Sequence, residues 1–262
     1  MSLKKIYFKK AYSSDFDDIL NDFYIPILKT SIEYERLSGF FSSTSLAIAA
    51  RGILGLVKNS GNMKLIVAPK FQKRDLETII NSYKNPEKYI EKRMLKELEK
   101  LEDKFVRDHV FALGWMIANK KLEIKVAIAF DNKQKLLDYK EIQNSGLFHQ
   151  KVGILRDSEG NIITFSGSIN ETAMGWLGNI EEFKVFRNWE LSEKDYVKAD
   201  ILKFNNFWNN KSIRLRIINI PHAVKEKLIE IAPKDIEEIQ LNKCYKLTKR
   251  KIKLFNHQKE AV

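Results

Sequence analysis

Short apolar runs of strand character alternate with longer runs of helical character along most of the 262 residues. MKLIVA at 63–68 and LEIKVAIAF at 122–130 are rich in β-branched residues and are bounded by turn residues or charges, as strands are. This alternation predicts an α/β (or α+β) fold, in which helices flank a mixed β-sheet. The expected strands are residues 4–9, 34–41, 63–68, 122–130, 148–155, 162–166, 182–187 and 213–220.

The helical segments differ in character. Residues 42–58 read as a buried helix, and the Ser/Thr cluster at its start can cap the free N–H groups there. Residues 89–104 are dense in Lys and Glu, so we expect a long helical excursion with a solvated face. The expected helices are 16–32 (interrupted near Pro26), 42–58, 73–117, 171–177, 197–208 and 223–231.

The net charge of +12 favours a polyanionic partner, with nucleic acid ahead of an anionic membrane. Half of the excess lies in residues 241–262, which hold seven basic residues and one acidic residue, a net +6. The alternative is that the basic residues simply reflect an AT-rich genome, which would also explain the Lys-, Ile- and Asn-rich composition.

No stretch reaches the roughly 18 apolar residues of a membrane span, and no apolar signal core follows Met1. The single Cys244 excludes an internal disulfide, which fits a reducing, cytoplasmic compartment. Because no apolar span is present, we expect no membrane partner.

Polar side chains with phosphate chemistry gather in residues 148–182. His149 and Lys151 lie two apart on an expected strand, so both side chains leave the same face. A turn at 157–161 predicts a hairpin, whose second strand leads into Gly167, Ser168, Ile169 and Asn170. Ser168 and Asn170 then present a hydroxyl and an amide near the end where Lys151 lies.

This collection of donors suits a phosphate group. Lys151 supplies positive charge, and Ser168 and Asn170 supply neutral donors. His149 can act as a nucleophile or as a general acid–base. Glu181 or Glu182 can orient the imidazole by accepting its second N–H.

His-x-Lys, then Gly-Ser-x-Asn, then an acidic residue resembles the HKD signature of the phospholipase D superfamily. The nuclease branch of that family places its Glu thirteen residues after the Ser, which here is Glu181. The resemblance implies that His149 attacks the phosphodiester phosphorus and forms a phosphohistidine, while Glu181 orients His149. It also implies that Lys151, Ser168 and Asn170 hold the phosphate oxygens, and that no metal is needed.

One letter of the signature departs from the family pattern. In the family, the Asp of this signature stands five residues after the Lys. This chain has Arg156 at that position, and Asp157 comes one residue later. In the family that Asp is largely structural, so the shift puts little of the catalytic assignment in doubt.

The family uses two motifs for each active site, because a second His protonates the leaving oxygen. This chain has one motif, since His109, His222 and His257 lack a Lys at +2 and a Gly-Ser-x-Asn partner. The resemblance therefore implies a homodimer whose two copies of His149 share one active site. The alternative is that the half-site pairs with a different chain.

The end of the chain has a second, weaker pattern. Leu-x-x-x-Gln-x-x-Ala-Val at 254–262 resembles the opening motif of superfamily 2 helicases, in which the Gln contacts adenine; here that is Gln258. The alternative is a basic tail that binds phosphates nonspecifically. We expect a nuclease domain at 1–190, an extension at 191–240, and a basic linker with the start of a helicase-like region at 241–262. ATP would be a cofactor only of a downstream helicase motor.

The leading expectation is a metal-independent DNA endonuclease, the nuclease part of a restriction, defence or repair helicase. Two alternatives stay open: a module that binds DNA phosphates without cutting, and a hydrolase of phospholipids or other phosphodiesters.

Overall fold

The computed structural model describes residues 2–13, 15–41, 47, 50, 52–69, 86–99, 104–133, 135, 137–144, 151–168 and 182–234. These residues form one eight-stranded sheet in the order β1-β7-β6-β5-β2-β3-β4-β8. β2, β3 and β4 are parallel to one another, and the other pairings are antiparallel, so the expected mixed sheet is confirmed. The strands are β1 (Ala11–Ser13), β2 (Glu33–Phe40), β3 (Asn62–Ala68), β4 (Leu122–Ala129), β5 (Lys151–Arg156), β6 (Ile162–Ser168), β7 (Glu182–Arg187) and β8 (Leu215–Asn219).

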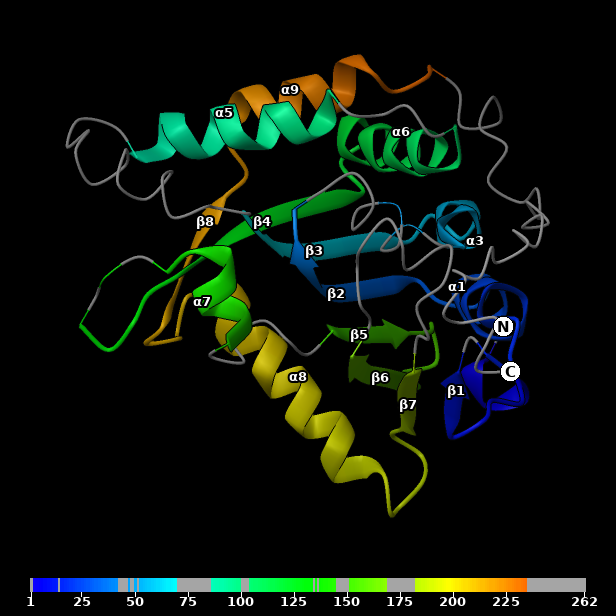
Figure 1. The fold of residues 1–262 in the computed structure, drawn as a ribbon. Coiled ribbons are helices and arrows are strands. Elements are labelled where there is room, and N and C mark those ends of the chain that lie inside the picture. The colour runs from blue at the N-terminus through cyan, green and yellow to red at the C-terminus, as the bar shows by residue number, and fades with distance from the viewer. Residues whose placement is uncertain are drawn as a thin grey trace, which may run out of the picture.

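Helices cover both faces of this sheet (Figure 1). The larger core lies between one face and a layer that includes α3, α5, α6 and α9, and we call this face of the sheet face A. The smaller core lies on the other face, face B, beneath α7 and α8. The helices are η1 (Leu3–Lys5), η2 (Leu20–Tyr24), α1 (Ile25–Leu28), α3 (Ile53–Lys58), α5 (Pro86–Leu98), α6 (Lys104–Ala118), α7 (Tyr139–Asn144), α8 (Lys194–Trp208) and α9 (His222–Glu230).

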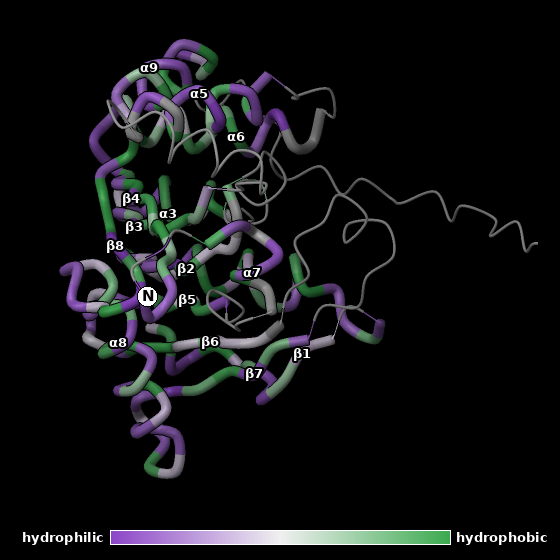
Figure 2. Tube along the Cα trace, turned by 60° about the vertical axis from the view of Figure 1, so that its left-hand side comes forward, coloured by the Kyte–Doolittle hydropathy of each residue, from purple (hydrophilic) through white to green (hydrophobic). Residues whose placement is uncertain are grey.

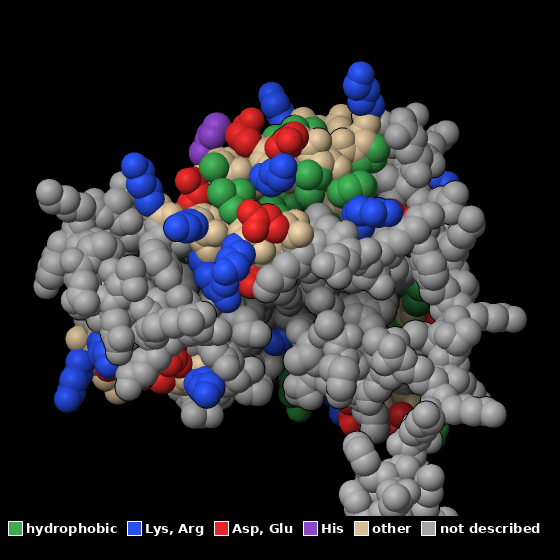
Figure 3. Space-filling model, turned by 45° about the horizontal axis from the view of Figure 1, so that its top comes forward, with side chains coloured by type: hydrophobic (Ala, Val, Ile, Leu, Met, Phe, Trp, Pro, Cys, Tyr) green, Lys and Arg blue, Asp and Glu red, His purple; other side chains and the backbone are tan. Residues whose placement is uncertain are grey.

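Strand pleating assigns each residue to one of these faces, because successive side chains point to opposite sides. On β5 the face A positions include Leu155, and the face B positions include Val152 and Ile154. Figure 2 shows apolar segments in the sheet and polar ones along the outer helices. In Figure 3 the layer of α5 and α9 carries acidic, basic and apolar side chains mixed together.

The start of the chain differs from expectation. The strand expected at 4–9 is wrong, because Leu3–Lys5 is a 3-10 turn whose Leu3 is fully buried. The first strand is instead β1, which pairs with β7 along the edge of the sheet. The helix expected at 16–32 is shorter: a π-helix begins at Leu20 and passes directly into α1, whose second residue is Pro26.

The long helical excursion expected at 73–117 contains two described helices, α5 and α6. Met94 of α5 and Leu113 of α6 belong to the larger core, so one face of the excursion is buried, while Lys88 and Lys92 of α5 are exposed on the expected solvated face. Helix α7 was not expected. The helix expected at 171–177, and most of the residues expected to begin the helix at 42–58, lie outside the described residues.

Segment 191–240, expected to be an extension, contributes α8, β8 and α9. β8 is an edge strand of the same sheet and pairs with β4. Phe204 of α8 lies in the smaller core, and Leu228 of α9 lies in the larger one. Within the part of the chain that the structure describes, no helix is both long and apolar enough to cross a bilayer.

Candidate functional site

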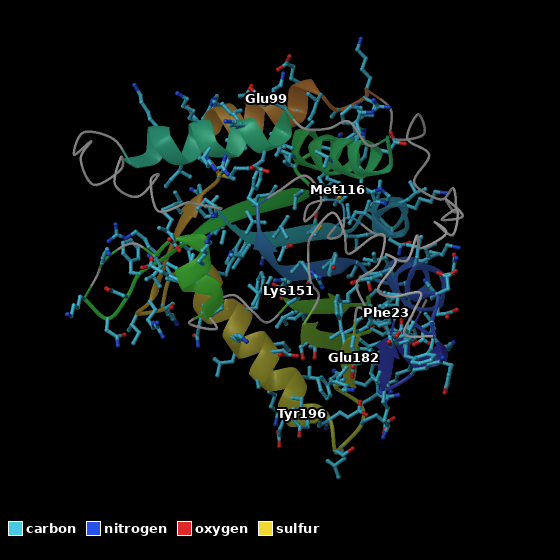
Figure 4. All side chains as sticks on the ribbon, in the orientation of Figure 1. Phe23, Glu99, Met116, Lys151, Glu182 and Tyr196 are labelled. Atoms are coloured by element: carbon cyan, nitrogen blue, oxygen red, sulfur yellow. The ribbon has the colours of Figure 1, made fainter. Side chains whose placement is uncertain are left out.

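The predicted hairpin and the parallel strands meet at one edge of the sheet. β2, β3 and β4 end at this edge, β6 ends there as well, and β5 and β7 begin there. In open α/β sheets, ligands bind outside the carboxyl ends of the strands. We call this row of strand ends the site edge, as distinct from the outer strands β1 and β8 of the sheet. Lys151 and Glu182 both lie on it in Figure 4.

Lys151 opens β5, and its side chain is buried, with 8% of the residue exposed. Its partner on β6 is Gly167, which has no side chain. On the other side, Val152 pairs with Leu37, so the neighbouring Ser38, 1% exposed, comes next to position 151. Lys151 therefore lies between two small residues on face A, and a buried ammonium of this kind is suited to hold an anion.

A second buried cation lies one strand away. Arg36 of β2 is 0% exposed and pairs with Gly153, so it shares face A with Lys151. Its guanidinium lies over the ring of Phe165, with Cζ 4.8 Å from the ring centroid. Gly153 is required here, because a Cβ at this position would collide with the Phe165 ring.

No role was expected for Arg36, although an arginine inside an aromatic strand is an unusual residue to bury. Its guanidinium stays protonated in proteins, so it brings a fixed positive charge to the face that carries Lys151.

Close packing of two strands requires glycine at position 167. In the structure, a Cβ at this position would collide with the carbonyl oxygen of Glu182, so glycine lets β7 approach β6 closely. The Gly-Ser-x-Asn run thus begins where β6 and β7 are tightly packed.

The remaining predicted site residues are placed only in part. Ser168 is the last residue of β6, and its backbone pairs with Glu182. His149, Asn170 and Glu181 lie outside the described residues, as does Gln258 in the tail. By chain position, His149 comes two residues before β5, Asn170 two residues after β6, and Glu181 one residue before β7.

Glu182, the alternative to Glu181, lies on the face of the sheet opposite to Lys151. Gly167 pairs with both Lys151 and Phe183, which places Phe183 on face A and its neighbour Glu182 on face B, the face that position 168 also occupies. Glu182 is exposed, and its carboxylate accepts a hydrogen bond from Lys184 at 2.6 Å, which lowers its pKa. A carboxylate engaged in this way in solvent is poorly suited to orient an imidazole, so this contact favours Glu181, which stays a prediction.

The buried carboxylate of Asp157 stabilises the turn between β5 and β6 through hydrogen bonds. It is 3% exposed, and its carboxylate accepts hydrogen bonds from the backbone N–H of Leu3, Glu159 and Asn161 and from the Asn161 side chain. Burial alone would raise its pKa, but these hydrogen bonds outweigh burial and hold the pKa below the ordinary value of 3.8. A carboxylate occupied in this way acts as a structural anchor between the turn and the N-terminal segment.

The other described histidines have structural or surface positions. His109 is 1% exposed within α6, and His222 begins α9 with its imidazole in solvent, 3.8 Å from Glu226. Among the described residues, no three His, Cys, Asp or Glu side chains are grouped as metal ligands would be.

No family model matches this sequence. No curated protein matches it either. Among solved structures, the chain is similar to Nuc of Salmonella typhimurium, described as a phospholipase D family member, with 11% identity and a TM-score of 0.39. That match covers 80% of this chain and 96% of Nuc.

The chain is also similar to phosphatidylserine synthase of Haemophilus influenzae Rd KW20, with 12% identity and a TM-score of 0.39. The match covers 84% of this chain but 44% of the synthase, so the chain spans less than half of that protein. Both likenesses concern the fold alone. The assignment of site residues rests on the sequence motif and on the geometry described above.

Proposed function

We propose that this chain is a metal-independent phosphodiesterase that cleaves DNA through a phosphohistidine formed on His149. The observation that carries the proposal is the position of Lys151. It is buried at the site edge, between small residues, where the sequence motif requires a cation for the phosphate. The buried Arg36 on the same face adds a fixed positive charge nearby.

The chemistry follows from the residue types. An imidazole nitrogen of His149 attacks phosphorus and forms a P–N bond, while the bond from phosphorus to the leaving oxygen breaks. The leaving oxygen takes a proton from a second histidine. Water then gives a proton back to this histidine and attacks phosphorus, which forms a P–O bond, breaks the P–N bond and frees His149. Lys151, Ser168 and Asn170 stabilise the negative charge on the phosphate oxygens in both steps.

The second histidine is the reason to propose a homodimer. Neither described alternative fits the role, because His109 is buried within α6 and His222 lies in solvent on α9. We propose that His149 of a second copy completes the site at a twofold axis. The link to a downstream helicase, with Gln258 at its start, is part of the same proposal and rests on the sequence motif alone.

Two other functions compete with this one. A DNA-binding module without cleavage would use the same cations, so only an activity measurement separates it from the nuclease. A phospholipid hydrolase is less favoured, because the net charge of +12 suits a nucleic-acid polyanion.

The test is cleavage of DNA and of bis(p-nitrophenyl) phosphate in excess EDTA by the whole chain. We expect cleavage that persists in EDTA, disappears in His149→Ala and is unchanged in His222→Ala. The second variant is the matched control, since His222 is an exposed histidine without the surrounding motif. Cleavage that requires magnesium and survives the loss of His149 would overturn the mechanism, and DNA binding without any cleavage would establish the module instead.

A further inference from the structure

A group of exposed basic residues also lies on the site edge, three to four strands from the buried Lys151. Here a hollow of about 190 Å³ lies between the end of β4 and the start of β8, lined by Phe130, Asn210, Ser212, Ile213, Leu215 and Arg216. We call it the β4–β8 hollow. It is smaller than the roughly 300–1,000 Å³ of a small-molecule pocket, so a whole ligand does not fit in it. A single unit of a polymer bound along the edge does fit.

The register places this hollow on the same face as Lys151. Ile128, which belongs to the face A core, pairs with Arg216, and Phe130 follows Ile128 at the next position on that face. The guanidinium of Arg216 lies over the Phe130 ring, with Cζ 5.1 Å from the centroid. An arginine held over an aromatic ring is a common platform for bases and phosphates in single-stranded nucleic acid.

The charge around the hollow has one sign. The segments 130–135 and 209–216 contain five basic residues and one acidic residue: Lys133, Lys135, Lys211, Arg214 and Arg216 against Asp131. The carboxylate of Asp131 is turned to its own backbone, where it accepts hydrogen bonds of 2.8 Å from the N–H groups of Lys133 and Lys135. The surface therefore presents mainly cations to solvent.

The backbone that carries these cations is held in place by its own side chains. Ser212 Oγ accepts hydrogen bonds from the N–H groups of Arg214 and Leu215, and Asn210 Oδ1 accepts one from Ile217. Ile213 is held at the rim with 88% of its surface exposed. A rigid loop loses little entropy on binding, so its contacts contribute more of their strength to affinity.

We infer that the β4–β8 hollow is an auxiliary binding subsite for the nucleic-acid strand that is cleaved at Lys151. β4 and β8 are three and four strands from β5, which is about 14–19 Å at ~4.8 Å per strand. At about 3.4 Å per nucleotide of a stacked strand, this distance corresponds to about four to six nucleotides. The subsite holds backbone phosphates with Lys211 and Arg216, and Ile213 and Phe130 contact the sugar or base.

The inference rests on the proposed function in one respect, that the same strand reaches Lys151, and the experiment separates the two. The double variant Lys211→Ala/Arg216→Ala removes two exposed cations: Arg216, which lines the hollow, and Lys211, which stands between the lining residues Asn210 and Ser212 in the chain. The matched control, Lys29→Ala/Lys58→Ala, removes two exposed lysines that precede β2 and β3 at the opposite edge.

Binding is measured by fluorescence anisotropy with a 15-nucleotide DNA and a trinucleotide, at several salt concentrations and in the His149→Ala background. We expect the hollow variant to bind the 15-mer about tenfold more weakly, with a log–log salt slope reduced by about two, whereas the control changes neither. Hydrolysis of bis(p-nitrophenyl) phosphate with His149 present is expected to stay unchanged, because this ligand does not reach from Lys151 to the hollow. The trinucleotide cannot span both sites and can still bind at Lys151, so it is expected to lose less affinity than the 15-mer.

Equal affinities and slopes for the hollow variant and the control would overturn the subsite, even if the wild-type chain cleaves DNA. If the chain cleaves nothing but the hollow variant still loses affinity and salt slope, the proposed function fails and the subsite stands. A loss of trinucleotide binding equal to the loss for the 15-mer would also refute the inference, because it would show a general effect on the site.

Discussion

Replacing Asp157 is expected to cost stability and not catalysis, although the residue stands one position from the third letter of the HKD motif. Its buried carboxylate accepts four hydrogen bonds from Leu3, Glu159 and Asn161, at 2.7–2.9 Å. A hydrogen bond to a charged group contributes about 1.5–3 kcal/mol, but bonds to one carboxylate are not additive. We therefore expect Asp157→Ala to lower the free energy of unfolding by about 3–5 kcal/mol.

For a domain of this size, each kcal/mol moves the melting temperature by about 2–4 °C, so the expected loss is about 6–20 °C. The assay is thermal and urea unfolding, together with cleavage per folded molecule below the transition. An Asp157→Asn variant keeps one acceptor oxygen at this position, so it should lose less stability than Asp157→Ala. An Asp157→Ala variant with unchanged stability but no activity would refute the structural role.

The pH dependence has a definite sign. The folded-state pKa of Asp157 lies below the ordinary value of 3.8, so its stabilising contribution is present above that value. The contribution is lost as pH falls through the folded-state pKa. The stability difference between wild type and Asp157→Asn should thus be constant from pH 7 to pH 5 and shrink below about pH 4; a difference that grows on acidification would contradict this sign.

Three further substitutions test the site. Lys151→Met should reduce cleavage by about 10²–10³-fold, measured as kcat/KM per folded molecule beside thermal unfolding, because it removes a positive charge from the phosphate site. Glu182→Gln should change activity less than threefold, whereas Glu181→Gln should lose most of it; a large loss in the first would reverse the assignment. Gly167→Ala should destabilise the chain by at least about 1–3 kcal/mol in urea unfolding, because its Cβ would collide with the backbone oxygen of Glu182.

The strands that form the middle of the sheet were predictable from the sequence. Residues 182–187 coincide with β7, and the expected strands at 34–41, 63–68 and 122–130 differ from β2, β3 and β4 by one residue at one or both ends. The apolar residues of these runs, such as Phe183 and Val185 of β7, fall at buried positions in the sheet, so local pattern and tertiary packing agree. The hairpin of β5 and β6 was predictable for the same reason, from its turn at 157–161.

Other elements depend on contacts that local sequence does not contain. The strand expected at 4–9 fails because Leu3 is buried and its N–H is bonded to Asp157, 154 residues away. Helix α7 was missed because it is short, although Asp138 and Glu141 exchange hydrogen bonds as a capping box and the spacing is visible in the sequence. β1 is three residues long and exists by pairing with β7.

The candidate site was predictable in its residue types and only partly in its surroundings. The spacing of His149 and Lys151 predicted a shared face, but the burial of Lys151 beside Gly167 follows from strand order, which the sequence did not provide. Arg36 joins the site only because β2 lies next to β5. That Glu182 lies on the face opposite to Lys151 likewise follows from the register of β7.

The most direct test of the half-site is a mixing experiment with wild-type and His149→Ala chains. The two are co-refolded at known ratios so that subunits exchange, and cleavage in EDTA is measured at constant total protein. If both histidines of a dimer serve one site, activity follows the square of the wild-type fraction, so an equal mixture retains about one quarter of the activity. A linear dependence, with half of the activity in the equal mixture, would show that each chain carries a complete site and would contradict the account.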